Sequence, residues 1–109
     1  MIRDEGSVVL RLTRELGLSL DEAQTYLKAL KDGSLRIGDG SSHSLLARGM
    51  LIRASDGKVY LPVHPRLAIS NLFRSFPDRT SAVMKAKRRM ADKLTLELIP
   101  AYEARRGTG

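Results

Sequence analysis

The residues whose types and spacing could do chemistry in this sequence are cations and hydroxyl groups suited to binding phosphate. Ser41, Ser42 and His43 open a short apolar run, where the free backbone amides of a helix N-terminus would attract an anion. The alternative is that the serines only cap the helix and that His43 is solvated, and we weigh the two interpretations equally. The other candidates nearby are basic: Arg36, Arg48, Arg53 and Lys58.

These four basic residues differ in what else could explain them. Arg53 and Lys58 flank an Asp-Gly turn, and cations at the tip of a hairpin are well placed for the backbone of a DNA duplex. We therefore favour a binding role for both. Arg48 could instead stabilise a helix C-terminus, and Arg36 has only its charge in favour of a contact.

The densest basic cluster lies further along the chain, on a stretch with helical periodicity. A run of this kind is usually the solvated face of a packed or paired helix, and we favour that interpretation for most of its members. Phosphate contacts from Lys85, Arg88 and Arg89 are the second interpretation. The cluster consists of Lys85, Lys87, Arg88, Arg89 and Lys93.

Residues that could support catalysis or hold a metal ion are few. The chain has two histidines, His43 and His64, and no cysteine. The segment Gly38–Gly40 lacks the Lys-Ser or Lys-Thr continuation of a phosphate-binding loop. Asp21 and Glu22 fit a helix N-terminus better than acid-base chemistry. We expect no enzyme activity, no cofactor and no metal site.

Composition favours a single domain that binds a polyanion. The 109 residues include 19 Lys and Arg against 12 Asp and Glu, which gives a net charge of +7, and 42% are hydrophobic. The excess is regional, because residues 1–33 carry a net charge of −1, residues 34–73 carry +3 and residues 74–109 carry +5. No apolar run is long enough to span a membrane. We expect a cytoplasmic, nucleoid-associated protein.

Two helices are expected before the candidate residues begin. Apolar side chains at helical spacing predict a first helix over Gly6–Leu16, ended by Gly17. Ser19 and Glu22 form an S-x-x-E capping box, which predicts a second helix that Gly33 ends. These helices would supply the body on which the candidate residues are mounted.

The candidate residues themselves fall on short elements. Leu35 and Ile37 alternate between turn residues, which predicts a very short strand, and a two-turn helix is expected from Ser41 or Ser42 to Gly49. The runs 50–54 and 59–63 read as two strands of a hairpin with Asp-Gly at its tip. We expect the hairpin to pack Leu51, Val59 and Leu61 on the helices.

Two further helices are expected after the hairpin. His64 would cap a helix that starts at Pro65 and ends at Phe76 and Pro77, and Asp78 would cap a last helix running to about Ile99 before Pro100. We expect residues 1–76 to form one domain, and residues 77–109 to add a dimerisation helix with a frayed tail from Ala104. The predicted stripe for pairing two copies consists of Val83, Met90, Leu94 and Leu98.

This order of elements is that of a winged helix, and two stretches resemble one family in particular. "LGLSLDEAQTYLKALKDG", Leu16–Gly33, resembles the opening motif of archaeal TrmB-type transcriptional regulators. "LLARGMLIRASDGKVYLPVHPRLAISNLF", Leu45–Phe73, is similar to the end of that family's recognition helix, its wing and the helix that follows. The resemblance implies a helix in the major groove, a wing at the DNA backbone and dimerisation through the C-terminal helix.

The chain departs from that family between the second helix and the wing. A usual winged helix places a support helix and a recognition helix there, whereas Ser34–Arg48 has only fifteen residues. The short helix would be about 10 Å long, little more than the depth of the major groove. We therefore expect a mainly α fold with a β hairpin, a pared-down winged helix that contacts phosphates more than bases.

The function expected from these observations is DNA binding by a homodimer, in transcription regulation or chromosome architecture. The alternative is an adaptor or subunit that kept the winged-helix scaffold for protein contacts, which the shortened segment favours and the net charge opposes. RNA binding is less favoured because the chain has only two phenylalanines and three tyrosines for base stacking.

Overall fold

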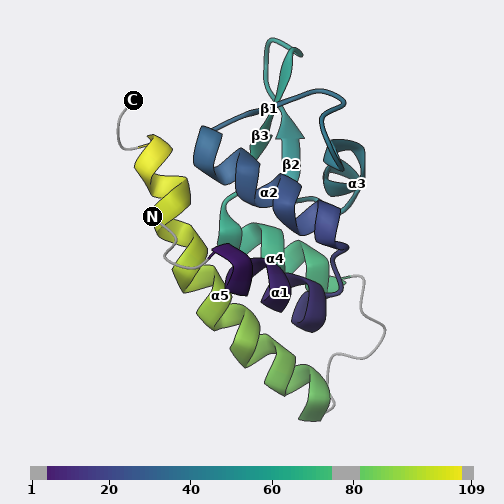
Figure 1. Cartoon of the computed structure of the whole chain (residues 1–109), viewed down its shortest axis with the longest axis vertical. Coiled ribbons are helices and arrows are strands. Elements are labelled where there is room, and N and C mark those ends of the chain that lie inside the picture. The colour runs from purple at the N-terminus through teal and green to yellow at the C-terminus, as the bar shows by residue number, and fades with distance from the viewer. Residues whose placement is uncertain (1–4, 75–81, 107–109) are drawn as a thin grey trace.

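The computed structural model describes residues 5–74 and 82–106, with the backbone alone for 105 and 106, as a mainly helical chain with one small antiparallel sheet. The helices in those ranges are α1 (Glu5–Leu16), α2 (Leu20–Asp32), α3 (Ser42–Ala47), α4 (Pro65–Arg74) and α5 (Ala82–Arg106). The strands there are β1 (Leu35–Arg36), β2 (Leu51–Arg53) and β3 (Val59–Pro62). In Figure 1 the sheet lies at one end of the helical body, and α5 runs along the side of that body.

The sheet joins a very short strand to a hairpin. The strand order is β1-β3-β2, with both neighbours antiparallel to the central β3. Tyr60 is paired with Leu35 on one side and with Arg53 on the other, whereas Arg36 is paired with Val59. Paired residues share a face of the sheet and adjacent residues alternate, so this register decides where each cation points.

The first two helices begin and end as the sequence predicts. The Glu22 backbone amide donates to the Ser19 hydroxyl at 3.0 Å, and the Ser19 amide donates to the Glu22 carboxylate at 2.8 Å, which completes the capping box. Gly33 ends α2 in the left-handed region at φ 84°, a conformation that a side chain would disfavour. The predicted first helix is likewise confirmed as α1.

The inward face of the hairpin differs from the prediction. Leu51 is buried as expected, but Val59 and Leu61 are only half-buried, and Tyr60 between them is fully buried. The prediction for Val59 and Leu61 is wrong because β3 has apolar side chains on both faces. Either face of such a strand could be turned inward, and the larger aromatic side chain occupies the core side.

The root of the hairpin is fastened to the helices by hydrogen bonds. The Tyr26 hydroxyl of α2 donates to the backbone carbonyl of Val63 at 2.8 Å, and burial raises the pKa of Tyr26 well above its ordinary value. His64 caps α4 as predicted, because its Nδ1 accepts the Arg66 amide at 3.1 Å and its carbonyl accepts the Ala68 amide at 2.9 Å. These contacts hold the base of the hairpin while its tip remains outside the core.

Helix α5 is part of the same core as the other helices. It packs against α1, α2 and α4, and Leu94 and Leu98 are 0% exposed within the single chain. The prediction that these two leucines pair two copies is therefore wrong, because α1, α2 and α4 already cover them. Val83 is 64% exposed and Met90 is half-buried. A homodimer therefore remains a prediction, and of the four predicted residues only these two are available for its contact.

The C-terminal end of α5 also differs from the prediction. The helix passes through Pro100 and continues to Arg106, although proline lacks the amide that bonds to the carbonyl four residues earlier. Leu96, which bears that carbonyl, is 64% exposed, and Pro100 is itself exposed, so water can take the place of the missing bond. Ala101 is buried and Tyr102 packs against the core, which holds the helix together beyond the proline.

Some predicted features lie outside the described residues. These are the ending at Phe76 and Pro77, the cap at Asp78, and the boundary between residues 76 and 77. No helix in residues 5–74 or 82–106 is both long and apolar enough to cross a membrane.

Candidate nucleic-acid interface

The hairpin turn projects two basic side chains beyond the helical body. The Ala54 amide donates to the Val59 carbonyl at 2.9 Å, and the Gly57 amide donates to the Ala54 carbonyl at 2.9 Å, which closes the turn. Gly57 adopts φ 73°, as the Asp-Gly pair predicts. The turn stands clear of the helices in Figure 1, so Arg53 and Lys58 are exposed to solvent on either side of it.

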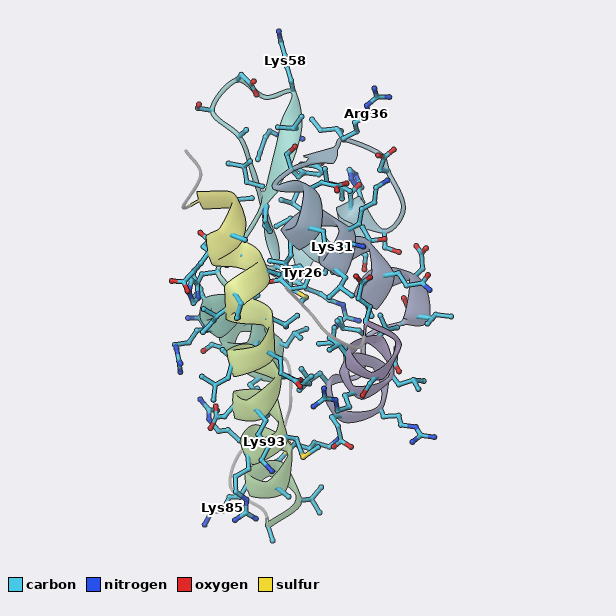
Figure 2. The ribbon with its side chains drawn as sticks, turned by 60° about the vertical axis from the view of Figure 1, so that its left-hand side comes forward. Tyr26, Lys31, Arg36, Lys58, Lys85 and Lys93 are labelled. Atoms are coloured by element: carbon cyan, nitrogen blue, oxygen red, sulfur yellow. The ribbon has the colours of Figure 1, made fainter. Side chains whose placement is uncertain are left out.

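Three exposed cations gather around this turn, and we call Arg36, Arg53 and Lys58 the hairpin end. None of them takes part in an ion pair within the part of the chain that the structure describes. The nearby Asp56 carboxylate accepts the Lys58 backbone amide at 2.9 Å and so belongs to the turn. Figure 2 shows Arg36 and Lys58 extending from the same end of the molecule. Their charges are therefore available to a partner.

The sheet register places these cations on both faces of the hairpin. Arg53 shares the face of Tyr60, and its guanidinium carbon lies 5.8 Å from the centre of that ring, a cation-π contact. Arg36 lies beside Val59 and faces the opposite way. The cations therefore flank the hairpin instead of lining one flat surface, an arrangement that suits insertion between two rows of phosphates.

The short helix α3 is tied to the N-terminus of α2 through Glu22. The Glu22 carboxylate accepts hydrogen bonds from the Ser44 hydroxyl and from Arg48 Nε, the latter at 2.7 Å. Burial of Glu22 opposes its charge, but hydrogen bonds from Ser19, Ser44 and Arg48 outweigh this effect and lower its pKa from 4.5 to about 2. Arg48, predicted as a DNA contact, thus neutralises a buried carboxylate of its own chain.

The serines that begin α3 also have partners inside the chain. Ser42 is 0% exposed and its hydroxyl oxygen accepts the Gly38 amide at 3.2 Å, so the prediction that Ser42 contacts DNA is wrong. The Ser41 hydroxyl donates to Asp21, and its amide donates to the Thr25 hydroxyl oxygen at 3.2 Å. The Asp21 carboxylate beside Ser41 would also repel a phosphate. These contacts give both serines a structural role, although not the predicted one, because Ser41 begins α3 without a side-chain hydrogen bond that caps the helix.

Gly49 fixes the step from α3 to the hairpin. Its φ is +80°, and a Cβ atom there would lie 2.7 Å from the side-chain nitrogen of Asn71. That same Asn71 nitrogen donates to the Gly49 carbonyl at 2.7 Å.

Of the predicted contacts on α3, His43 remains exposed, and its side chain has no hydrogen bond or ion pair in the described part of the chain.

The basic residues of α5 lie at the other end of the molecule. Figure 2 places Lys85 at the end opposite Lys58, and the chain is 42 Å long along its longest axis. Arg88 lies over the Phe73 ring at 5.2 Å, and Lys87 donates to the Glu15 carbonyl at 3.1 Å. Lys85, Arg88 and Arg89 are exposed, but they do not join the hairpin end in one surface.

The site contains one feature that the sequence does not reveal. Glu22 is recognisable as a capping residue, but its contacts with Ser44 and Arg48 span 22 and 26 residues, and no local pattern signals them.

In residues 5–74 and 82–106, no group of three His, Asp or Glu side chains is placed to hold a metal ion. Comparison with known proteins adds no relative, because no family model, curated protein or solved structure matches the chain.

Proposed function

We propose that this chain binds duplex DNA through the hairpin end, contacting backbone phosphates more than bases. The observation that carries the proposal is that Arg36, Arg53 and Lys58 are exposed together and have no ion-pair partner in the described part of the chain. Lysine and arginine side chains that neutralise phosphates release counterions, which gives affinity without sequence preference.

The order of elements supports a pared-down winged helix as the scaffold. The succession α2, β1, α3, β2, β3 and the strand order β1-β3-β2 are those of a winged helix that lacks one helix. The resemblance of Leu16–Gly33 and Leu45–Phe73 to TrmB-type regulators points the same way. We place the protein in transcription regulation or chromosome architecture, at the nucleoid.

The short length of α3 and its contacts within the chain are the reason for proposing phosphate contacts. Its six residues span about 9 Å, and Ser42 and Ser44 are engaged by their own chain. A hairpin with cations on both faces can instead enter a groove and meet the phosphates of both strands. Affinity for DNA would then depend weakly on sequence.

The test is fluorescence anisotropy of a labelled random-sequence duplex with three forms of the protein. Arg53→Gln combined with Lys58→Gln removes two charges from the hairpin end. Lys28→Gln combined with Lys31→Gln removes two charges from α2, where both lysines lie within 4.0 Å of a carboxylate. We expect the hairpin variant alone to bind about tenfold more weakly. Equal affinities for both variants and the unmodified chain would rule out the hairpin end.

A second candidate function is a protein-interaction adaptor. An open groove of about 720 Å³ runs between α1 and α2, and its lining includes Val9, Leu10, Leu20 and Leu27. Leu10 and Leu20 are more than half exposed, as surfaces that bind proteins often are. A gel-shift titration against random duplex separates the two functions, because an adaptor would cause no retardation even at low salt.

A further inference from the structure

A row of three cations on α5 is not used by the proposed function. Lys85, Arg89 and Lys93 are spaced four residues apart, so they follow one side of the helix at intervals of about 6 Å, and we call them the α5 stripe. All three are exposed, and the side chain of none has an ion pair or hydrogen bond among residues 5–74 and 82–106. Their neighbours Lys87 and Arg88 add to the positive charge.

Helix stability does not explain the stripe. Side chains four residues apart are neighbours on a helix, so Lys85 and Arg89 repel each other, and Arg89 and Lys93 do the same. An arrangement that costs the helix stability is better explained by an anionic partner.

The α5 stripe and the hairpin end lie toward opposite ends of the molecule. In Figure 2 Lys58 extends from one end of the molecule, whereas Lys85 and Lys93 lie toward the other. The longest dimension of the chain is 42 Å. A straight duplex that crosses the hairpin tip at right angles to this axis does not reach the stripe, because DNA resists sharp bending over such distances. The α5 stripe is then open to a second anionic partner.

We propose that the α5 stripe binds a second DNA duplex, so that one chain bridges two duplexes. The proposal rests on the proposed function for the contact at the hairpin end. A membrane surface fits less well, since the apolar side of α5 is buried in the core through Ala91, Leu94 and Leu98. Single-stranded RNA also fits less well because Phe73, the aromatic ring at this end of α4, is buried beneath Arg88.

The experiment is a bridging assay with the full chain. One duplex is fixed to beads, and the protein is tested for its ability to retain a second, labelled duplex that has no attachment of its own. The stripe variant combines Lys85→Gln with Arg89→Gln, and its matched control combines Lys28→Gln with Lys31→Gln, which has the same net charge. Anisotropy with a single duplex and circular dichroism are measured on each protein, which separates a loss of bridging from a loss of folding.

The expected result is that the unmodified chain and the control retain the second duplex, while the stripe variant retains at least fivefold less and still binds one duplex through the hairpin end. Three results would overturn the bridging proposal: binding of one duplex without retention of a second, full retention by the stripe variant, or retention of single-stranded RNA in place of duplex. Loss of all duplex binding only in the hairpin variant, with no bridging, would uphold the proposed function and reject this inference.

Discussion

The hairpin end and α3 carry similar polar and basic side chains, yet the chain uses them differently. On α3 and at its C-cap, the side chains of Ser42, Ser44 and Arg48 form hydrogen bonds with other parts of the same chain. At the hairpin end Arg36 and Lys58 are exposed and have no ion pair in the described residues. Side-chain type therefore does not show whether a side chain is available to a partner, whereas its contacts within the chain do.

Glu22 is the residue that makes this difference. It accepts hydrogen bonds from the Ser19 amide and from two side chains of the α3 region, so it joins the start of α2 to α3. A buried charge held in this way contributes to the stability of the fold only while its hydrogen-bond partners are present. The following predictions use stability and DNA affinity to separate the two regions.

The largest effect is expected from Glu22→Gln. Removal of the carboxylate leaves Arg48 without its partner, and we expect a loss of about 2 kcal/mol in the free energy of unfolding at pH 7. Denaturant unfolding measures this loss, with Asp32→Asn, an exposed acid of the same helix, as the control. DNA affinity of the folded variant should be unchanged, and a large fall in affinity would mean that α3 contacts DNA.

The same residue makes the stability of the chain depend on pH. The pKa of Glu22 is lowered from 4.5 to about 2 on folding, so the stability it contributes is fully present above pH 4.5 and is lost as the pH falls toward 2. The difference in unfolding free energy between the unmodified chain and Glu22→Gln should therefore shrink over this range. A difference that stays constant from pH 7 to pH 2.5 would contradict the role given to the Glu22 charge.

The next largest effect is expected at the hairpin end. Arg53→Gln with Lys58→Gln should weaken duplex binding about tenfold, equivalent to about 1.4 kcal/mol, and should lower the slope of log K against log salt by about 2. Stability should change little because both side chains are exposed. Binding titrations at several salt concentrations measure the slope, and an unchanged slope would exclude phosphate contacts from these two side chains.

Arg48→Gln should have the reverse effect, a loss of stability with little change in DNA affinity, and this effect should be smaller. Its side chain is 35% exposed, so solvent screens part of the ion pair with Glu22, and we expect a stability loss of about 1 kcal/mol. Affinity for DNA should change less than twofold. Thermal unfolding and anisotropy on the same sample measure both quantities. A variant that keeps its stability but binds DNA several-fold more weakly would move Arg48 to the binding surface.

The smallest effect is expected from His43→Ala. His43 is exposed on α3 and has no internal partner in the described residues, so neither stability nor affinity should change by more than about 0.5 kcal/mol. Titration with a labelled duplex and denaturant unfolding measure the two quantities. A several-fold loss of affinity would restore α3 as part of the interface.

Local signals in the sequence predict the start of α2 and the hairpin, but not the contacts between elements. The Ser19 and Glu22 capping box predicts α2, and the Asp-Gly pair predicts the hairpin, because each motif satisfies its hydrogen bonds within a few residues. The inward face of β3 is not predictable from its residues because three in succession, Val59, Tyr60 and Leu61, are apolar.

The candidate site was predictable only where its side chains have no internal partner. Arg53 and Lys58 lie at an exposed turn, as expected, whereas Ser42 is buried by a contact with the Gly38 amide that depends on how the loop folds back. The apolar side of α5 that contains Leu94 is compatible with two arrangements, the pairing of two copies and the filling of one core. The packing of α1, α2 and α4 against it decides for the core.

The most direct test of the central claim is to map amide chemical shifts of the labelled protein as a random-sequence duplex is added. The account predicts that signals of Arg36 and residues 53–59 shift in proportion to bound DNA, while those of residues 42–48 stay within the change seen on adding salt alone. Shifts concentrated in residues 42–48, with the hairpin turn unchanged, would contradict it.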